Sequence, residues 1–265
     1  MPQPGNADAP KRVVSINVCT DQLAMLLAEE GQLLSVSHLA RDPRTSAMAT
    51  EARDYPTNRG QAEDVFLLKP DLVVAGAYTA RATVEMLKQF DIPVVIFTPS
   101  SGIDDISDKI AQMGEALGRE EAADEMIADF HARLAALRAY TGDRPRAALY
   151  FANGYTLGDQ TLAGQILVAA GFANIAAETG RSSGGTLPLE VLALSNPDFI
   201  VTSEKYPGAS RSEAIMDHPV VQRLSRDIAA GAVSDRDWIC GTPYVLRAIE
   251  ELAAVRENLE HSSPE

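Results

Sequence analysis

Two glutamates stand at the head of the same short phrase, and their spacing is the first feature that suggests a function. Residues 63–74 read EDVFLLKPDLVV and residues 190–201 read EVLALSNPDFIV. In each copy the glutamate, Glu63 or Glu190, precedes a Pro-Asp pair by seven residues. A carboxylate at a helix start stabilises the local dipole by about 0.3–1 kcal/mol, and it also pairs well with an arginine of another protein. The phrase therefore allows a structural role and a docking role.

A second set of residues has the chemistry of a thiol enzyme. Cys19 and His38 are a possible nucleophile and base. Against this, the chain contains no GxSxG, P-loop or GxGxxG motif. Cys19 and Cys240 are the two cysteines, and they can form a disulfide, contact a ligand metal or remain free. A bridge needs Cα atoms within about 7 Å and would obstruct a cleft, so we expect free, partly buried thiols.

The elements that position these residues alternate between strands and helices. Apolar runs predict strands at residues 13–17, 33–37, 72–75 and 94–97, with helices between them. A second series of this kind begins at residues 147–151. The alternation predicts an α/β protein with largely parallel sheets and helices on both faces. We expect two three-layer lobes, at residues 11–103 and 144–260, with a ligand cleft between them.

The segment between the two lobes has a different pattern. Apolar residues recur at three- and four-residue steps over residues 104–140, and no proline interrupts them. This predicts a single long connecting helix over residues 104–141, or two nearly collinear ones, with Gly114 and Gly118 as the weak points. A helix of about 25 residues would be roughly 37 Å long and would act as a rigid spine.

Composition argues against two classes of main partner. The chain of 265 residues is 46% apolar and carries a formal charge of −14, which argues against nucleic acid and anionic membranes.

The first ten residues, MPQPGNADAP, lack the apolar region of a secretory signal. The sequence does not separate a cytosolic start from one that replaces a removed leader. Its histidines show no HxxxH or HExxH spacing, so we expect no resident metal and no cofactor.

The order of these features resembles the substrate-binding proteins of ABC importers that carry vitamin B12, ferric siderophores and haem. The resemblance covers roughly residues 11–259, and the paired Glu…Pro-Asp phrases carry it. It implies a periplasmic protein with two α/β lobes joined by one long helix and ligand held between them. It also implies that one glutamate on each lobe, Glu63 and Glu190, docks onto arginines of a membrane permease dimer. We expect a monomer.

Candidate ligand contacts follow from the position of loops in α/β lobes. Ligand-facing residues lie just past the carboxyl ends of the strands. This rule selects Cys19, Thr20, His38, Arg59, Tyr78, Arg81 and Ser100 in the first lobe, and Tyr155, Arg181, Trp238, Cys240 and Tyr244 in the second. Trp238 can stack on a large ring or pack within its lobe, and the arginines can pair with ligand carboxylates or remain solvated. A tyrosinate at Tyr78 or Tyr155 can ligate haem iron.

The sequence thus favours a non-catalytic carrier whose cargo metal arrives already chelated, as a ferric siderophore or a cobalamin-like corrinoid. Haem is the alternative cargo, and an enzyme that uses Cys19 and His38 is the more distant one. B12 binders of the resembling family carry an aromatic residue shortly before the second Glu helix. This chain has Ser-Ser-Gly-Gly at residues 182–185, which weakens the corrinoid case.

Overall fold

The structure is a computed structural model that describes residues 9–202, 211–226 and 235–262. The chain forms two compact units, and both are built from several chain segments. The first unit comprises Met1–Ser100, Asp104–His131 and Ile239–Pro243, and the second comprises Ser101–Ile103, Ala132–Trp238 and Tyr244–Glu265. Among the described residues, no helix combines the length and the apolar character that crossing a bilayer requires.

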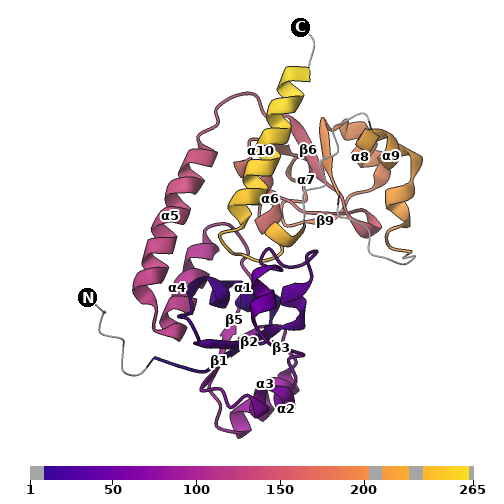
Figure 1. The fold of residues 1–265 in the computed structure, drawn as a ribbon. Helices are drawn as coiled ribbons and strands as arrows, with labels where there is room; N and C mark the ends of the chain where they lie inside the picture. The colour runs from indigo at the N-terminus through magenta and orange to yellow at the C-terminus, as the bar shows by residue number, and fades with distance from the viewer. Residues whose placement is uncertain (1–8, 203–210, 227–234, 263–265) are drawn as a thin grey trace. The chain divides into compact units, whose positions relative to one another are not determined.

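The first unit is a five-stranded parallel sheet with helices on both faces (Figure 1). Its strands run in the order β3-β2-β1-β4-β5. Their bounds are β1 Val13–Ser15, β2 Leu33–Ser37, β3 Thr57–Asn58, β4 Leu72–Gly76 and β5 Val94–Phe97. The helices are α1 Val18–Leu27, α2 Ala62–Leu67, α3 Arg81–Gln89, α4 Asp105–Leu117 and the start of α5 Glu120–Arg138, with short 3-10 turns at His38–Arg41 and Glu51–Asp54.

Alternation along the strands divides the core of the first unit into two layers. Val14 and Ile16 lie in one buried cluster with Val65 of α2 and Leu87 of α3. On the opposite face α1 packs beside α4. Because side chains of a strand point alternately to the two faces, this short sheet is covered twice. The predicted three-layer arrangement with a parallel sheet is confirmed here.

The second unit repeats part of this plan on a smaller sheet. Three parallel strands run in the order β10-β6-β8, and β7 pairs antiparallel with β9. The strands are β6 Arg146–Leu149, β7 Tyr155–Thr156, β8 Ala173–Asn174, β9 Gly185–Thr186 and β10 Phe199–Val201. The helices are α6 Leu162–Ala169, α7 Ile175–Glu178, α8 Leu189–Ser195, α9 Pro219–Arg226 and α10 Val245–Ser262, with 3-10 turns at Ala152–Gly154, Ala214–Asp217 and Asp235–Asp237.

The predicted helix over residues 104–141 is two helices that double back on each other. Gly118 adopts a left-handed conformation with φ of 67° and ends α4, and α5 begins two residues later. The Ser107 hydroxyl of α4 lies 3.0 Å from the His131 ring of α5. Residues 24 positions apart in one straight helix would be roughly 36 Å apart, so the prediction of one continuous or collinear helix is wrong. The boundary between the units falls inside α5, after His131.

Candidate functional site

A pocket of about 300 Å³ opens in the first unit where three neighbouring strands end. Strands β1, β4 and β5 are parallel, so their carboxyl ends meet at one edge of the sheet. The lining residues come from the loops after these strands, from α1 and α4, and from the 239–243 segment. They are Asn17, Val18, Cys19, Thr20, Leu23, Gly76, Ala77, Tyr78, Phe97, Thr98, Pro99, Ser100, Lys109, Ile239 and Gly241. Cys19, Thr20, Tyr78 and Ser100 were among the candidates selected from sequence.

Local sequence chemistry holds the inner wall of this pocket in place. Asn17 caps α1, and its side-chain oxygen accepts from the backbone N–H of Cys19 at 3.0 Å. The Thr20 hydroxyl is buried and lies 2.8 Å from that of Ser15. Gly76 leaves room for the cap, since a Cβ there would lie 2.8 Å from the Asn17 amide nitrogen. Asn17 was missed as a lining residue, although its place before an apolar run is a helix-start signal.

The two cysteines form a disulfide, with their Cα atoms 5.1 Å apart. The expectation of free thiols was wrong. The bridge lies within the first unit, because Cys240 belongs to the short segment Ile239–Pro243 that this unit takes from the far end of the chain. The sequence could not reveal this proximity across 221 residues. A cystine sulfur is no thiol nucleophile, so the hypothesis of a Cys19–His38 enzyme also fails.

The lining of the pocket is largely apolar and nearly uncharged. Lys109 is the single cation among the described lining residues, and its ammonium group donates to the Thr98 hydroxyl at 2.8 Å. The Ser100 hydroxyl oxygen is buried and has no hydrogen-bond partner among the described residues. Tyr78 is 89% exposed, so its ring and phenol are open to solvent or ligand. The pocket thus offers apolar contacts and a few hydroxyl groups.

A buried carboxyl group lies directly behind this wall. Asp21 is fully buried in α1 and accepts hydrogen bonds from the backbone N–H and the hydroxyl of Ser37. Burial raises the pKa of Asp21 to about 6, and the hydrogen bonds from Ser15 and Ser37 only partly oppose this shift. The pairing ties α1 to β2 and makes the packing of this helix sensitive to pH.

Three candidates of the first unit lie away from the pocket. His38, Arg59 and Arg81 are exposed and do not line it. Their proposed ligand contacts remain predictions.

The candidates of the second unit have varied surroundings. Tyr155 is 46% exposed, whereas Trp238 is 6% exposed. Arg181 donates to the backbone carbonyls of Thr179 and Thr186, both at 2.7 Å. The Arg247 guanidinium lies 4.2 Å from the centre of the Tyr244 ring. Arg181 thus has a structural role, and ligand contacts by Tyr155, Arg181, Trp238 and Tyr244 remain predictions.

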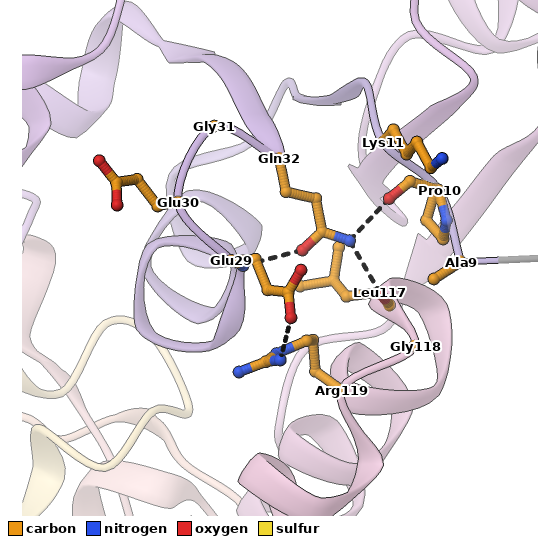
Figure 2. Close-up of a pocket in the computed structure, with 10 residues that line it drawn as sticks. All are labelled: Ala9, Pro10, Lys11, Glu29, Glu30, Gly31, Gln32, Leu117, Gly118 and Arg119. Atoms are coloured by element: carbon orange, nitrogen blue, oxygen red, sulfur yellow. Dashed lines mark hydrogen bonds and ion pairs between the residues drawn. The ribbon is translucent and has the colours of Figure 1, made fainter. Parts of the chain in front are cut away.

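A second pocket, of about 440 Å³, lies at the amino ends of β1 and β2 (Figure 2). Its central side chain, Gln32, is buried and already saturated. The Gln32 amide donates to the carbonyls of Pro10 and Leu117, both at 2.8 Å, and its oxygen accepts from the N–H of Glu29. Arg119 in turn pairs with the Glu29 carboxylate (Figure 2). These groups satisfy one another, so we assign this pocket a structural role despite its larger volume.

Glu63 and Glu190 occupy equivalent positions in the two units. Each is the second residue of its helix, α2 or α8, and each is exposed. Within the part of the chain that the structure describes, neither carboxylate forms an ion pair or a hydrogen bond. Both are therefore available to a partner.

The Pro-Asp half of each phrase has a structural role. Asp71 accepts from the backbone N–H of Arg12 at 2.9 Å, and Asp198 accepts from that of Arg146 at 2.7 Å. The guanidinium groups of the same two arginines also donate, from Arg12 to the Leu68 carbonyl and from Arg146 to the Ser195 carbonyl. Leu68 and Ser195 both stand five residues after the glutamate. The phrase therefore fastens each Glu helix to the start of the strand beside it.

Comparison with known proteins assigns the family. The profile described as "Periplasmic binding protein" matches residues 13–228. The chain belongs to the periplasmic binding protein family. This confirms the resemblance read from the sequence.

Individual relatives agree with the family. The chain is 31% identical over 198 residues to a cobalamin-binding protein of Halobacterium salinarum, covering 73% of this chain and 54% of that protein. It thus spans about half the length of this relative. It is 24% identical to an uncharacterised ABC transporter substrate-binding lipoprotein of Bacillus subtilis, over 92% of this chain and 79% of that one.

Solved structures share the fold. The periplasmic haem-binding protein HutB of Vibrio cholerae superposes with a TM-score of 0.75 at 19% identity, over 92% of this chain and 98% of that one. This likeness confirms the two-lobed α/β fold.

Proposed function

We propose that this chain is the non-catalytic solute-binding component of an ABC importer, located outside the cytoplasm, and that its cargo is a corrinoid. One observation supports the carrier function above the others. The pocket at the strand ends has the lining of a binding site and lacks a nucleophile with a base, because Cys19 is bridged and His38 lies elsewhere. Family membership and a relative named as an ABC transporter substrate-binding lipoprotein support the same function.

The charge of the pocket favours a corrinoid over an anionic siderophore. A ferric tris-catecholate carries several negative charges, which need cations to replace lost hydration. Within the part of the lining that the structure describes, Lys109 is the only cation, and it already donates to Thr98. The rim of a corrin ring carries methyl groups and neutral carboxamides, which suit a largely apolar wall without strong charge. A volume of about 300 Å³ takes one edge of such a ligand. The name of the Halobacterium salinarum relative supports the same cargo.

Haem is the second candidate, and Tyr78 favours it. The Tyr78 side chain is 89% exposed at the mouth of the pocket, and a tyrosinate is a known axial ligand of haem iron. Haem would also bring propionate groups, for which Lys109 is the one cation that the described lining residues offer.

Titration calorimetry with cyanocobalamin, ferrichrome, a ferric catecholate and hemin tests the cargo. We expect a dissociation constant of about 1 µM or below for cyanocobalamin, equivalent to roughly −8 kcal/mol, and no saturable heat from the catecholate. Tyr78→Ala should weaken binding, and Met86→Ala, at an exposed position of the same unit outside the described pocket lining, serves as the control. Tight binding of hemin that Tyr78→Phe abolishes would replace the corrinoid by haem. The absence of saturable binding heat with every ligand would refute both proposed cargoes.

Docking to the permease is proposed through Glu63 and Glu190. Arginine–carboxylate pairs give orientation and fast association, and a permease dimer has two equivalent subunits to receive two equivalent helices. The double variant Glu63→Ala with Glu190→Ala should lose uptake of labelled cyanocobalamin and keep its affinity for the ligand. Normal uptake by cells that carry this double variant would refute the docking role.

A further inference from the structure

The two Glu helices also expose a leucine each, at the same place in the repeated phrase. Leu67 is 76% exposed and Leu194 is 87% exposed. Among the other large apolar side chains that the structure describes, only Tyr78, at the pocket mouth, exceeds half exposure. A single exposed leucine is ordinary on a protein surface and needs no explanation. Two at matching positions, with the highest aliphatic exposures described, form a pattern.

The match between the two helices is residue by residue. Leu67 follows Glu63 by four positions, and Leu194 follows Glu190 by four. Residues four apart lie on one face of a helix, so each leucine stands one turn from the unpaired carboxylate. The buried side of the two helices also matches. Val65 and Leu192 each stand two positions after the glutamate, and each is buried in the core of its own unit. The exposed face of each helix is thus a carboxylate beside a leucine.

The first unit extends this apolar surface. Phe66 of α2 and Phe90 of α3 are about half exposed, and their ring centres lie 4.7 Å apart. In the second unit Ala193 stands where Phe66 stands in the first. The two surfaces therefore share the Glu–Leu pair and differ in the aromatic surface around it.

We propose that Leu67 and Leu194 are docking residues that enter apolar recesses of the permease, one on each subunit, beside the cation that receives the neighbouring glutamate. This rests on the proposed transport function and names further contacts of the same partner. Buried apolar anchors next to charged pairs are the usual anatomy of a specific interface. A partner with two equal recesses fits a surface that this chain presents twice.

Other occupants fit the charges less well. An anionic lipid surface would repel a chain of net charge −14 whose exposed leucines each stand beside a glutamate. A second copy of the chain would set like charges against each other at the same contacts. A membrane protein with a basic, recessed outer face has the complementary chemistry.

Photo-crosslinking in cells that carry the native importer tests the contact without knowledge of the cargo. Benzoyl-phenylalanine is placed at position 67, 194 or 39, and Leu39, which is 42% exposed in the first unit, is the matched control. We expect adducts with the transmembrane subunit of an ABC importer from positions 67 and 194 and none from position 39, as identified by mass spectrometry. Adducts with a second copy or with lipid, or equal yields from all three positions, would overturn the proposal.

A parallel measurement separates this inference from the proposed function. Leu67→Ser with Leu194→Ser should lower uptake of labelled cyanocobalamin by about tenfold, which corresponds to roughly 1.4 kcal/mol of binding free energy, while Leu39→Ser leaves uptake unchanged. If the double glutamate variant loses uptake but the crosslinkers yield no permease adduct, the leucine contacts are wrong and the transport function stands. If the double glutamate variant also keeps full uptake, the docking role itself is wrong.

Discussion

Removal of the disulfide should destabilise the protein and loosen one wall of the pocket. The bridge joins Cys19 to Cys240 across 221 residues, so it removes the closure entropy of a very long loop from the unfolded chain. The loop-entropy relation gives about 5 kcal/mol for a closure of this length, and measured losses on removal of native bridges are typically about 2–5 kcal/mol. We expect the double variant Cys19→Ser with Cys240→Ser to lose about 4 kcal/mol.

The expected loss of about 4 kcal/mol also sets the expected decrease in melting temperature. For a chain of this size each kcal/mol shifts Tm by roughly 2–4 °C, so the double variant should melt roughly 10 °C below the oxidised protein. Ile239 and Gly241 line the pocket on either side of Cys240, and the segment that holds them loses its covalent anchor. The affinity for ligand should therefore fall together with Tm.

Thermal unfolding with and without dithiothreitol tests this reasoning. Reduction should lower the Tm of the wild-type protein to that of the double serine variant and should leave the variant itself unchanged. A variant that melts within about 1 °C of the oxidised protein would refute the closure account. So would an effect of dithiothreitol on the variant, because that chain contains no cysteine.

Three further outcomes are expected. The pKa of Asp21 is raised to about 6 in the folded protein, against roughly 3.9 in the unfolded chain, so its contribution to stability is present below pH 4 and is lost as pH rises through 6. Urea unfolding between pH 4 and pH 7 should therefore show that the free energy of unfolding falls by about 3 kcal/mol, and Asp21→Asn should abolish this fall. Parallel pH profiles for the free energy of unfolding of the wild-type protein and the variant would contradict this. Gly241→Ala should weaken ligand binding by about tenfold because its Cβ would collide with Ser100, and Ser100→Gly should restore binding; no rescue would place the effect elsewhere. Asp71→Ala should cost about 1–2 kcal/mol, as should Asp198→Ala, through lost charged hydrogen bonds at the strand starts, and unchanged urea midpoints would speak against that bracing role.

The sequence predicted the parts of the fold that local pattern controls. Apolar runs located strands β1, β2, β4 and β5 of the first unit, and strand parallelism then placed Cys19, Thr20, Tyr78 and Ser100 at one sheet edge. The rule works because parallel strands share the direction in which their loops emerge. It selected loops that line the pocket, and ligand contact by their residues remains a prediction.

The failures concern contacts that no local pattern encodes. The apolar period runs unbroken from α4 into α5, and only the left-handed conformation of Gly118 reverses the chain. Periodicity reports which face of a helix is apolar and carries no information on what that face packs against. The disulfide and the pocket contacts of Ile239 and Gly241 depend on a segment that returns to the first unit from the far end of the chain. Lys109 reaches the pocket because α4 packs beside α1, and no local pattern in the sequence indicates that contact.

The repeated phrase has a structural half and an exposed half, and docking is the function that we propose for the exposed half. The buried proline, the aspartate and the paired arginine fix each helix to its strand, and they satisfy backbone groups that the strand start leaves open. The side chains of the glutamate and the leucine make no hydrogen bond or ion pair among the described residues, and both are exposed. A phrase needed for folding alone would have no reason to expose a leucine in both copies, since burial of that side chain would stabilise the fold by about 1.5–3 kcal/mol. An exposed leucine forgoes this stabilisation in both units, and a partner that binds both helices would account for the exposure.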